Sequence, residues 1–219
     1  RYGSDKPDLR FGLELVDLGA DLAQSGFRAF SETLAAGGVI KAVVGPGLGE
    51  GASRKVIDDW TEVAKRHGAK GLINLKVEAD GSLKSGISKF LTPVELAAIK
   101  DRTGAQPGDL ILVVADKFTV ACEVLGRLRL ELAERAKLVP ADVYRFLWVH
   151  QFPLLDYSAE EQRWVSVHHP FTSPLPEDMG KFDSDPGAVR ARAYDVVLNG
   201  VEIGGGSIRI HQPEMQARV

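Results

Sequence analysis

Two carboxylates near the end of the chain have a spacing that could hold a divalent cation. Asn199-Gly200 lies between two runs of β-forming residues, and this dipeptide is the strongest short-range signal of a two-residue hairpin turn. The turn predicts three cross-strand pairs: Leu198 with Val201, Val197 with Glu202, and Asp195 with Gly204. Asp195 and Glu202 would then be diagonal neighbours on one face, where their oxygens suit Mg²⁺ that bridges phosphates. The alternative is a solvated hairpin face with two unrelated acids.

Three consecutive glycines, Gly204, Gly205 and Gly206, follow in the second strand of this hairpin. Glycine weakens a strand through backbone entropy and lost packing. The run therefore indicates a place where a ligand lies directly on the backbone, or else a bulge or crowded packing against another element.

Arg209 stands seven residues after Glu202, so a regular strand would place the two side chains on opposite faces. If both serve one site, the strand must change parity through a bulge within residues 204–208. A surface arginine in a salt bridge is the alternative.

His168-His169 form a second cluster of chemically capable side chains. Adjacent histidines on a strand point to opposite faces, so we expect at most one to reach a given pocket. No further zinc ligands are found near them, and a purely structural role is the alternative.

The elements that must position these residues form an α+β pattern in three parts: residues 1–25, 26–118 and 119–219. In the middle part we predict strands over residues 39–44, 71–77 and 109–115. Ser53 caps a predicted helix that Gly68 ends, and Thr92-Pro93 opens another over residues 93–103.

The third part is predicted to begin with a long amphipathic helix from residue 119, because apolar residues recur there every four positions. Strands are predicted over residues 146–149, 164–167, 194–198 and 201–210. A loop rich in Pro, Asp and Gly occupies residues 174–187.

Composition narrows the class of protein without indicating its chemistry. The net charge of −3 excludes a polycation made for nucleic acid, and no apolar run approaches the roughly 20 residues of a membrane span. Cys122 is the single cysteine, which fits a reducing cytosol and hence a cytoplasmic protein. A start at Arg1 and an end inside a helix-like segment lead us to expect a piece of a longer chain.

Two sequence stretches resemble bacterial aspartyl-tRNA synthetases, which are class II enzymes: residues 168–174 (HHPFTSP) and 193–211 (AYDVVLNGVEIGGGSIRIH). Residues 1–8 (RYGSDKPD) resemble the segment before that family's insertion. The middle, with Gly68–Leu72, Lys89–Leu91 and Gly108-Asp109, is similar to the inserted GAD domain, which an amidotransferase subunit shares. The resemblance covers the whole length in the same order.

This resemblance implies an antiparallel-sheet catalytic core interrupted by a compact α+β insertion. It implies aspartate–tRNA ligation, in which ATP activates L-aspartate to aspartyl-adenylate and the aspartyl group passes to tRNA. Arg209 would bind the side-chain carboxylate of aspartate, His168 and His169 would contact it from a loop, and Gly204–Gly206 would form the floor. Asp195 and Glu202 would hold Mg²⁺ on ATP.

Further partners also follow from the resemblance. The acceptor would be the aspartate tRNA, with the asparagine tRNA left open, and the full-length enzyme would be a homodimer. The family's other ATP-binding motifs would lie outside these residues, so we expect the piece alone to be inactive. Two alternatives stay open: the insertion as a non-catalytic tRNA- or protein-contact module, and a sister synthetase for another amino acid.

Overall fold

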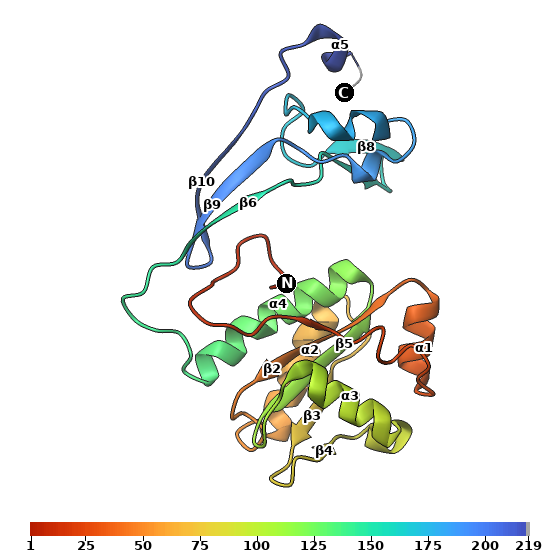
Figure 1. Cartoon of the computed structure of the whole chain (residues 1–219), viewed down its shortest axis with the longest axis vertical. Helices are drawn as coiled ribbons and strands as arrows, with labels where there is room; N and C mark the ends of the chain where they lie inside the picture. The colour runs from red at the N-terminus through yellow and green to blue at the C-terminus, as the bar shows by residue number, and fades with distance from the viewer. Residues whose placement is uncertain (218–219) are drawn as a thin grey trace. The chain divides into compact units, whose positions relative to one another are not determined.

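An antiparallel five-stranded sheet organises the first half of the chain. The structure is a computed structural model and describes residues 1–217. The strand order is β1-β2-β5-β3-β4 (Figure 1). The strands are β1 (Val16–Asp17), β2 (Val39–Gly45), β3 (Ile73–Val77), β4 (Leu83–Lys84) and β5 (Leu110–Asp116). Residues 110–114 of the central β5 are buried and apolar, because helices cover both faces of the sheet.

Two layers of helices cover the sheet. Helices α1 (Arg28–Ala35) and α3 (Pro93–Thr103) pack through Phe30 and Ile99 on the face that carries Ile40 and Ile111, and the short 3-10 helix η1 (Ser88–Phe90) precedes α3. Helices α2 (Arg54–Arg66) and α4 (Phe118–Arg135) cover the opposite face, where Trp60 is buried. Each face therefore has its own hydrophobic core.

The helix ends follow the capping signals of the sequence. The Ser53 side chain accepts a hydrogen bond from the Val56 N–H at the start of α2. Thr92 and Glu95 form a complete capping box at the start of α3, with Pro93 in the first turn. Each cap satisfies N–H groups that have no partner within the helix.

Arg129 of α4 fixes the N-terminal segment to the helix. Its side chain is 1% exposed, and it donates hydrogen bonds to the carbonyl oxygens of Phe11, Gly12 and Leu13 at 3.1, 2.8 and 3.0 Å. The guanidinium also lies 4.8 Å from the centre of the Tyr2 ring and 4.3 Å from that of Phe11. A buried cation is tolerated here because carbonyl dipoles and aromatic faces replace its water.

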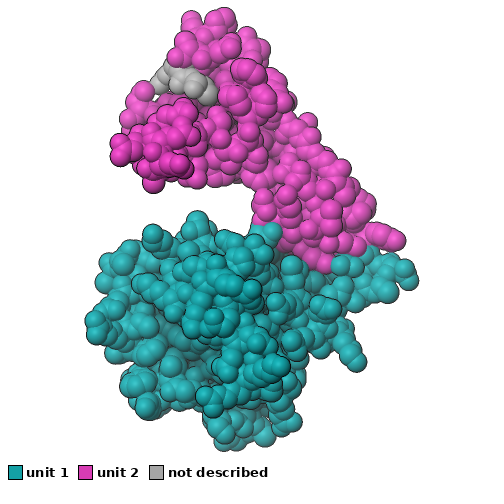
Figure 2. Space-filling model, turned by 180° about the vertical axis from the view of Figure 1, so that it is seen from behind, with its two compact units in different colours: residues 1–4, 10–143 teal, residues 5–9, 144–219 magenta. Residues whose placement is uncertain are grey.

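A second unit contains the later strands, and Figure 2 colours the two units separately. Unit 1 comprises residues 1–4 and 10–143, and unit 2 comprises residues 5–9 and 144 onward. Unit 2 has a sheet in the order β10-β9-β6 and a separate β7-β8 hairpin. Its elements are β6 (Phe146–His150), β7 (Leu155–Ser158), β8 (Arg163–Ser166), η2 (Pro176–Lys181), η3 (Pro186–Ala188), β9 (Ala193–Leu198), β10 (Val201–Ser207) and α5 (Pro213–Gln216).

A buried carboxylate holds the loop that carries the two 3-10 helices. Asp178 is 1% exposed and accepts hydrogen bonds from the side chains of Arg190 (2.6 Å) and Lys181 (2.6 Å) and from the Arg190 N–H (3.0 Å). These donors hold the pKa of Asp178 well below its usual range. The loop is thereby tied to the segment that leads into β9.

The expected α+β class is confirmed, and the predicted strands and helices of the middle part are found within two residues of their expected bounds. The last strand is shorter than predicted, because β10 ends at Ser207 and residues 208–210 belong to irregular pairing. The two compact units meet at other positions than the predicted boundaries at residues 25/26 and 118/119, because compactness does not reveal where an insertion begins and ends. These boundaries therefore stay a prediction. No helix among residues 1–217 is long and apolar enough to cross a membrane.

We expect Arg129→Met to lower the free energy of unfolding of the chain by about 2–5 kcal/mol, because one buried and two partly buried carbonyl oxygens lose their donor. The control is Arg127→Met on the same helix, where Arg127 is exposed and pairs with Glu123. Its loss should stay below about 1 kcal/mol. Urea denaturation followed by far-ultraviolet circular dichroism measures both, and equal effects would show that Arg129 does not fix the segment.

Candidate functional site

The hairpin of β9 and β10 contains a bulge at Ile203. Leu198 pairs with Val201 and Val197 with Glu202, as predicted. The next pair joins Val196 to Gly204, so Ile203 has no partner and the register shifts by one residue. Asp195 is therefore opposite Gly205, and the predicted pair of Asp195 with Gly204 is wrong.

The bulge changes the parity of β10 beyond it. Without it, Glu202 and Arg209 would face opposite sides of the sheet. With Ile203 as the extra residue, Gly205 and Ser207 take the face of Glu202 and Asp195, and Arg209 continues the same alternation. The predicted parity change is confirmed. The bulge itself lies at Ile203, one residue before the predicted range of 204–208 and before the glycine run.

Two of the three glycines are required by close approach. A Cβ on Gly205 would overlap the carboxylate of Asp195, and a Cβ on Gly206 would lie 2.8 Å from the Tyr194 hydroxyl. At Gly204 a Cβ would meet Val196 Cγ1 at 3.7 Å, which is an ordinary contact. Crowded packing, one of the alternatives, thus accounts for Gly205 and Gly206.

The histidine cluster reaches this hairpin through backbone pairing. Thr172 forms an isolated antiparallel bridge with Arg209, the Ser173 N–H donates to the Ile208 carbonyl (2.8 Å), and the Ile210 N–H donates to that of Phe171 (2.8 Å). The segment 171–173 thus pairs with residues 208–210 through an isolated bridge and two flanking backbone hydrogen bonds. The two sequence clusters, about 30 residues apart in the chain, lie side by side for this reason.

Both histidines line one open cavity of about 300 Å³, so the expectation that at most one could do so is wrong. That expectation assumed a strand, whereas His168 and His169 follow β8 in a bend and a loop. The His168 ring packs edge-on against Phe152, with centroids 4.6 Å apart. His169 Nδ1 accepts a hydrogen bond from the Phe171 N–H at 3.2 Å, so its neutral ring carries its proton on Nε2.

The cavity contains most of the predicted site residues and some that were not predicted. Of the predicted set it is lined by His168, His169, Asp195, Glu202, Gly205, Gly206 and Arg209, whereas Gly204 does not line it. Thr172, Ala193 and Ser207 are additional lining residues. Side chains two positions apart on a strand share a face, so Ala193 lies on the face of Asp195 and Ser207 on that of Arg209. The sequence could have indicated both as lining residues if the position of the bulge had been known.

Two carboxylates and an ammonium group determine the charge at one end of the cavity. Burial and the negative charge of Glu202 raise the pKa of Asp195 above its ordinary value. Lys6 Nζ lies 2.8 Å from Glu202 Oε2, and this contact raises the pKa of Lys6. Lys6 was not predicted, because the sequence does not indicate that residues 5–9 lie beside the hairpin.

Arg209 makes no side-chain hydrogen bond or ion pair within residues 1–217, which argues against the alternative of a surface salt bridge. Arg209 lines the same cavity as Asp195 and Glu202 and forms an ion pair with neither of them. A planar fork of donors with no partner is suited to a carboxylate from outside the chain.

The donor set of Asp195 and Glu202 fits Mg²⁺ better than zinc. No group of three or more His, Cys, Asp or Glu side chains in the described part of the chain converges as a metal cluster. Mg²⁺ is commonly held by one or two carboxylates together with water and substrate phosphates. Burial and the negative charge of Glu202 raise the pKa of Asp195, and a divalent cation beside the two carboxylates would offset both effects.

We expect Gly205→Ala to destabilise unit 2 by about 1–3 kcal/mol, because the added methyl group overlaps the Asp195 carboxylate. Gly204→Ala is the matched control, since its methyl group meets only Val196 at contact distance. Chemical denaturation followed by tryptophan fluorescence measures both. Equal losses for the two variants would mean that general strand effects, and not the close approach to Asp195, require glycine.

Asp195→Asn should stabilise the folded chain at neutral pH and lose that effect in acid. Because the folded-state pKa of Asp195 is raised, folding disfavours its ionised form, and this group's contribution to stability falls as pH rises through the unfolded and then the folded pKa. The advantage of asparagine should therefore vanish below a pH of about 4. Thermal unfolding across pH tests this, with Glu160→Gln, an exposed carboxylate between β7 and β8, as the control. A pH-independent difference would contradict it.

Comparison with known proteins connects both units to one kind of enzyme. The family model of the GAD domain matches residues 30–125. The aspartate–tRNA ligase of Ruminiclostridium cellulolyticum is 48% identical over 219 residues, which is 100% of this chain and 37% of that protein. The aspartate–tRNA(Asp/Asn) ligase of Geotalea uraniireducens is 51% identical over 217 residues, or 99% of this chain and 36% of that protein.

A third relative, the aspartate–tRNA(Asp/Asn) ligase of Moorella thermoacetica, is 51% identical over 100% of this chain and 36% of its own length. The chain thus spans little more than a third of the length of the curated relatives it matches. Residues 30–125 match the GAD domain model, and the chain is similar, from one end to the other, to a segment of bacterial aspartate–tRNA ligases.

Proposed function

We propose that this chain forms the aspartate-binding side of the active site of an aspartate–tRNA ligase, together with the inserted GAD domain. The enzyme would activate L-aspartate with ATP and transfer the aspartyl group to tRNA. The observation that carries the proposal is Arg209, whose guanidinium has no partner among the described residues and shares a cavity with Asp195 and Glu202. Similarity to ligases over the whole chain supports it.

Arg209 would bind the side-chain carboxylate of aspartate through two parallel hydrogen bonds. Glutamine or asparagine offers a neutral amide at that position and would leave the cation without a counter-charge. This pairing favours an acidic substrate over the amide substrates of a sister synthetase.

Asp195 and Glu202 would hold Mg²⁺, which when bound supplies positive charge to the phosphates of ATP. The two carboxylates would in turn be released from their mutual repulsion. Lys6 now provides the nearby positive charge, because its ammonium group lies 2.8 Å from Glu202. When the cation binds, Lys6 would have to give up its ion pair with Glu202 or share the carboxylate with the cation.

The two histidines would position aspartate from the loop side of the cavity. His169 can donate from Nε2, because its Nδ1 accepts the Phe171 N–H. His168 would line the cavity with a ring that Phe152 holds by edge-on packing. Gly205 and Gly206 would let the substrate approach the backbone, whereas Gly204, which does not line the cavity, would lie at its margin.

Several features of the whole enzyme belong to the same proposal. They are a class II catalytic core divided by the insertion at residues 26–118, a homodimer, a cytoplasmic location, and the aspartate tRNA as acceptor. Two of the relatives are named as ligases for the aspartate and asparagine tRNAs, so the asparagine tRNA is included as a second acceptor.

A chimera tests the aspartate-binding role of Arg209. This chain replaces the matching segment of the Ruminiclostridium cellulolyticum ligase, to which it is 48% identical. Aspartate-dependent ATP–pyrophosphate exchange should occur with the unmodified chain. Arg209→Leu should reduce kcat/KM for aspartate by at least about 100-fold, because one charged bidentate contact contributes several kcal/mol. The KM for ATP should change far less.

Arg163→Leu is the control for the chimera, since Arg163 is exposed in β8 and pairs with Glu161. It should leave exchange unchanged. Aspartate activation that survives Arg209→Leu would remove the assigned role. An inactive unmodified chimera that is folded would count against the proposed function itself.

A further inference from the structure

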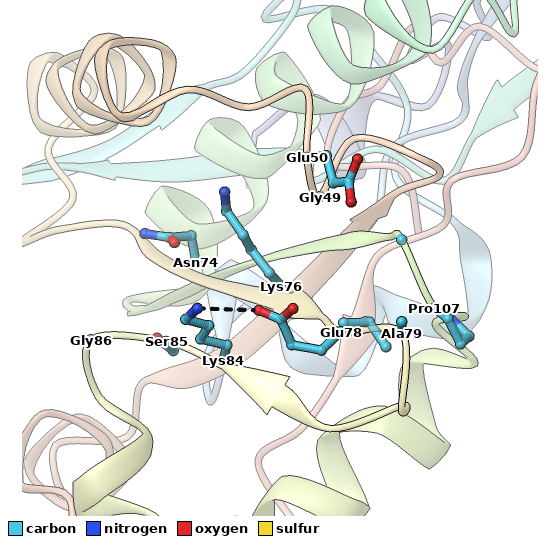
Figure 3. A pocket seen from close by; sticks show the side chains of 12 residues that line it. Gly49, Glu50, Asn74, Lys76, Glu78, Ala79, Lys84, Ser85, Gly86 and Pro107 are labelled. Atoms are coloured by element: carbon cyan, nitrogen blue, oxygen red, sulfur yellow. Dashed lines mark ion pairs between the residues drawn. The ribbon is translucent and has the colours of Figure 1, made fainter.

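A second cavity lies in unit 1, on the sheet of the GAD-like region, and it shares no lining residue with the cavity described above. Its volume is about 760 Å³, within the range of roughly 300–1,000 Å³ that small-molecule sites occupy. β3 and the end of β4 form its floor, and the loops at residues 46–53 and 104–109 form walls (Figure 3).

The polar residues on this floor are unusual for their place in the sheet. Asn74 and Lys76 of β3 pair with Leu112 and Leu110 of β5, both of which are fully buried beneath α2 and α4. A sheet face that is covered by helices normally carries apolar residues. Asn74 and Lys76 are half-buried, so their amide and ammonium groups indicate a part of the sheet that binds a polar partner.

The charges around the cavity are only partly neutralised. Lys76 is paired directly with Lys84 across β3 and β4, an arrangement that is destabilising for like charges. Lys84 forms an ion pair with Glu78, in which Lys84 Nζ and Glu78 Oε1 are 3.7 Å apart. The ammonium group of Lys76 donates one hydrogen bond, to the Ala52 carbonyl at 3.4 Å. Lys76 therefore still attracts an anion.

An acidic group reaches the same cavity from its wall. Glu50 projects from the 46–53 loop, while Lys76 and Asn74 rise from β3 (Figure 3). Neither the carboxylate of Glu50 nor the amide of Asn74 makes a side-chain hydrogen bond or ion pair within residues 1–217. The cavity thus offers one available cation, one available anion and one amide.

The walls are held in place before any ligand binds. The Gly49 N–H donates to the Gly108 carbonyl at 2.8 Å, and a Cβ on Gly49 would lie 2.7 Å from that oxygen. The Gly47 N–H donates to Asp109 Oδ1 at 2.8 Å. Such bonds between the two walls reduce the ordering that binding would otherwise require.

We propose that this cavity binds a small zwitterion of the amino-acid or short-peptide class. Its carboxylate contacts Lys76 and Asn74, and its ammonium group contacts Glu50. A polyanion such as an RNA backbone fits less well, because Glu50 and Glu78 would repel it. The site is separate from the cavity that contains Arg209, and it does not depend on aspartate activation.

Triglycine and its two capped forms test the proposal on the isotope-labelled full chain. Triglycine should shift the amide cross-peaks of residues 49–50, 74–78 and 84–86 in NMR titrations. Triglycine amide and acetyl-triglycine, which each lack one charge, should bind about tenfold more weakly, because a hydrogen bond to a charged group is lost in each case.

Two variants assign the charges, and one serves as a control. Lys76→Met should abolish the preference for the free carboxylate but keep the preference for the free ammonium group, and Glu50→Gln should do the reverse. Lys65→Met, on the exposed side of α2 where Lys65 pairs with Glu62, should change neither preference. Dispersed cross-peaks in each variant verify that it is folded.

Equal binding of all three peptides, or no shifts at these residues, would overturn the proposal. Equivalent shifts from inorganic phosphate would also overturn it, because they would indicate a simple anion site. Since the readout is binding to unit 1, neither outcome bears on the ligase activity proposed above.

Discussion

The site depends on one extra residue in one strand. Seven residues separate Glu202 from Arg209, and an odd separation places two side chains on opposite faces of a regular strand. Ile203, which has no partner in β9, makes the effective separation even. The carboxylate end and the arginine end of the cavity can therefore face the same ligand only because this bulge is present.

The bulge alone would leave the site open on one side, and backbone pairing completes it. Residues 171–173 hydrogen-bond to residues 208–210, and the Arg192 N–H also donates to the Ser173 carbonyl at 2.8 Å. Arg190, close by in the chain, is held by the buried Asp178. Asp178 thus holds the segment that leads into β9, next to the residues that pair with the segment 171–173.

Features that depend on a few consecutive residues could be predicted from the sequence. The capping box of Thr92 and Glu95 and the Asn199-Gly200 turn each satisfy local backbone requirements, so neighbouring residues determine them. A bulge was predicted within residues 204–208 if Glu202 and Arg209 share a site, and the register instead shifts between Glu202 and Gly204. The histidines were misplaced because the pattern was taken as a strand, and Lys6 was missed because its neighbour, Glu202, lies 196 positions away.

The two cavities use charge in different ways, and this difference separates their functions. Asp195 and Glu202 are like charges on one face of the hairpin, and burial together with the negative charge of Glu202 raises the pKa of Asp195. Lys6 offsets only part of this rise, from an exposed position where solvent screens the attraction. A site of this kind gains most from a concentrated positive charge. The cavity of unit 1 instead presents Lys76 from its floor and Glu50 from one wall, so the proposed zwitterion would satisfy both charges without any metal.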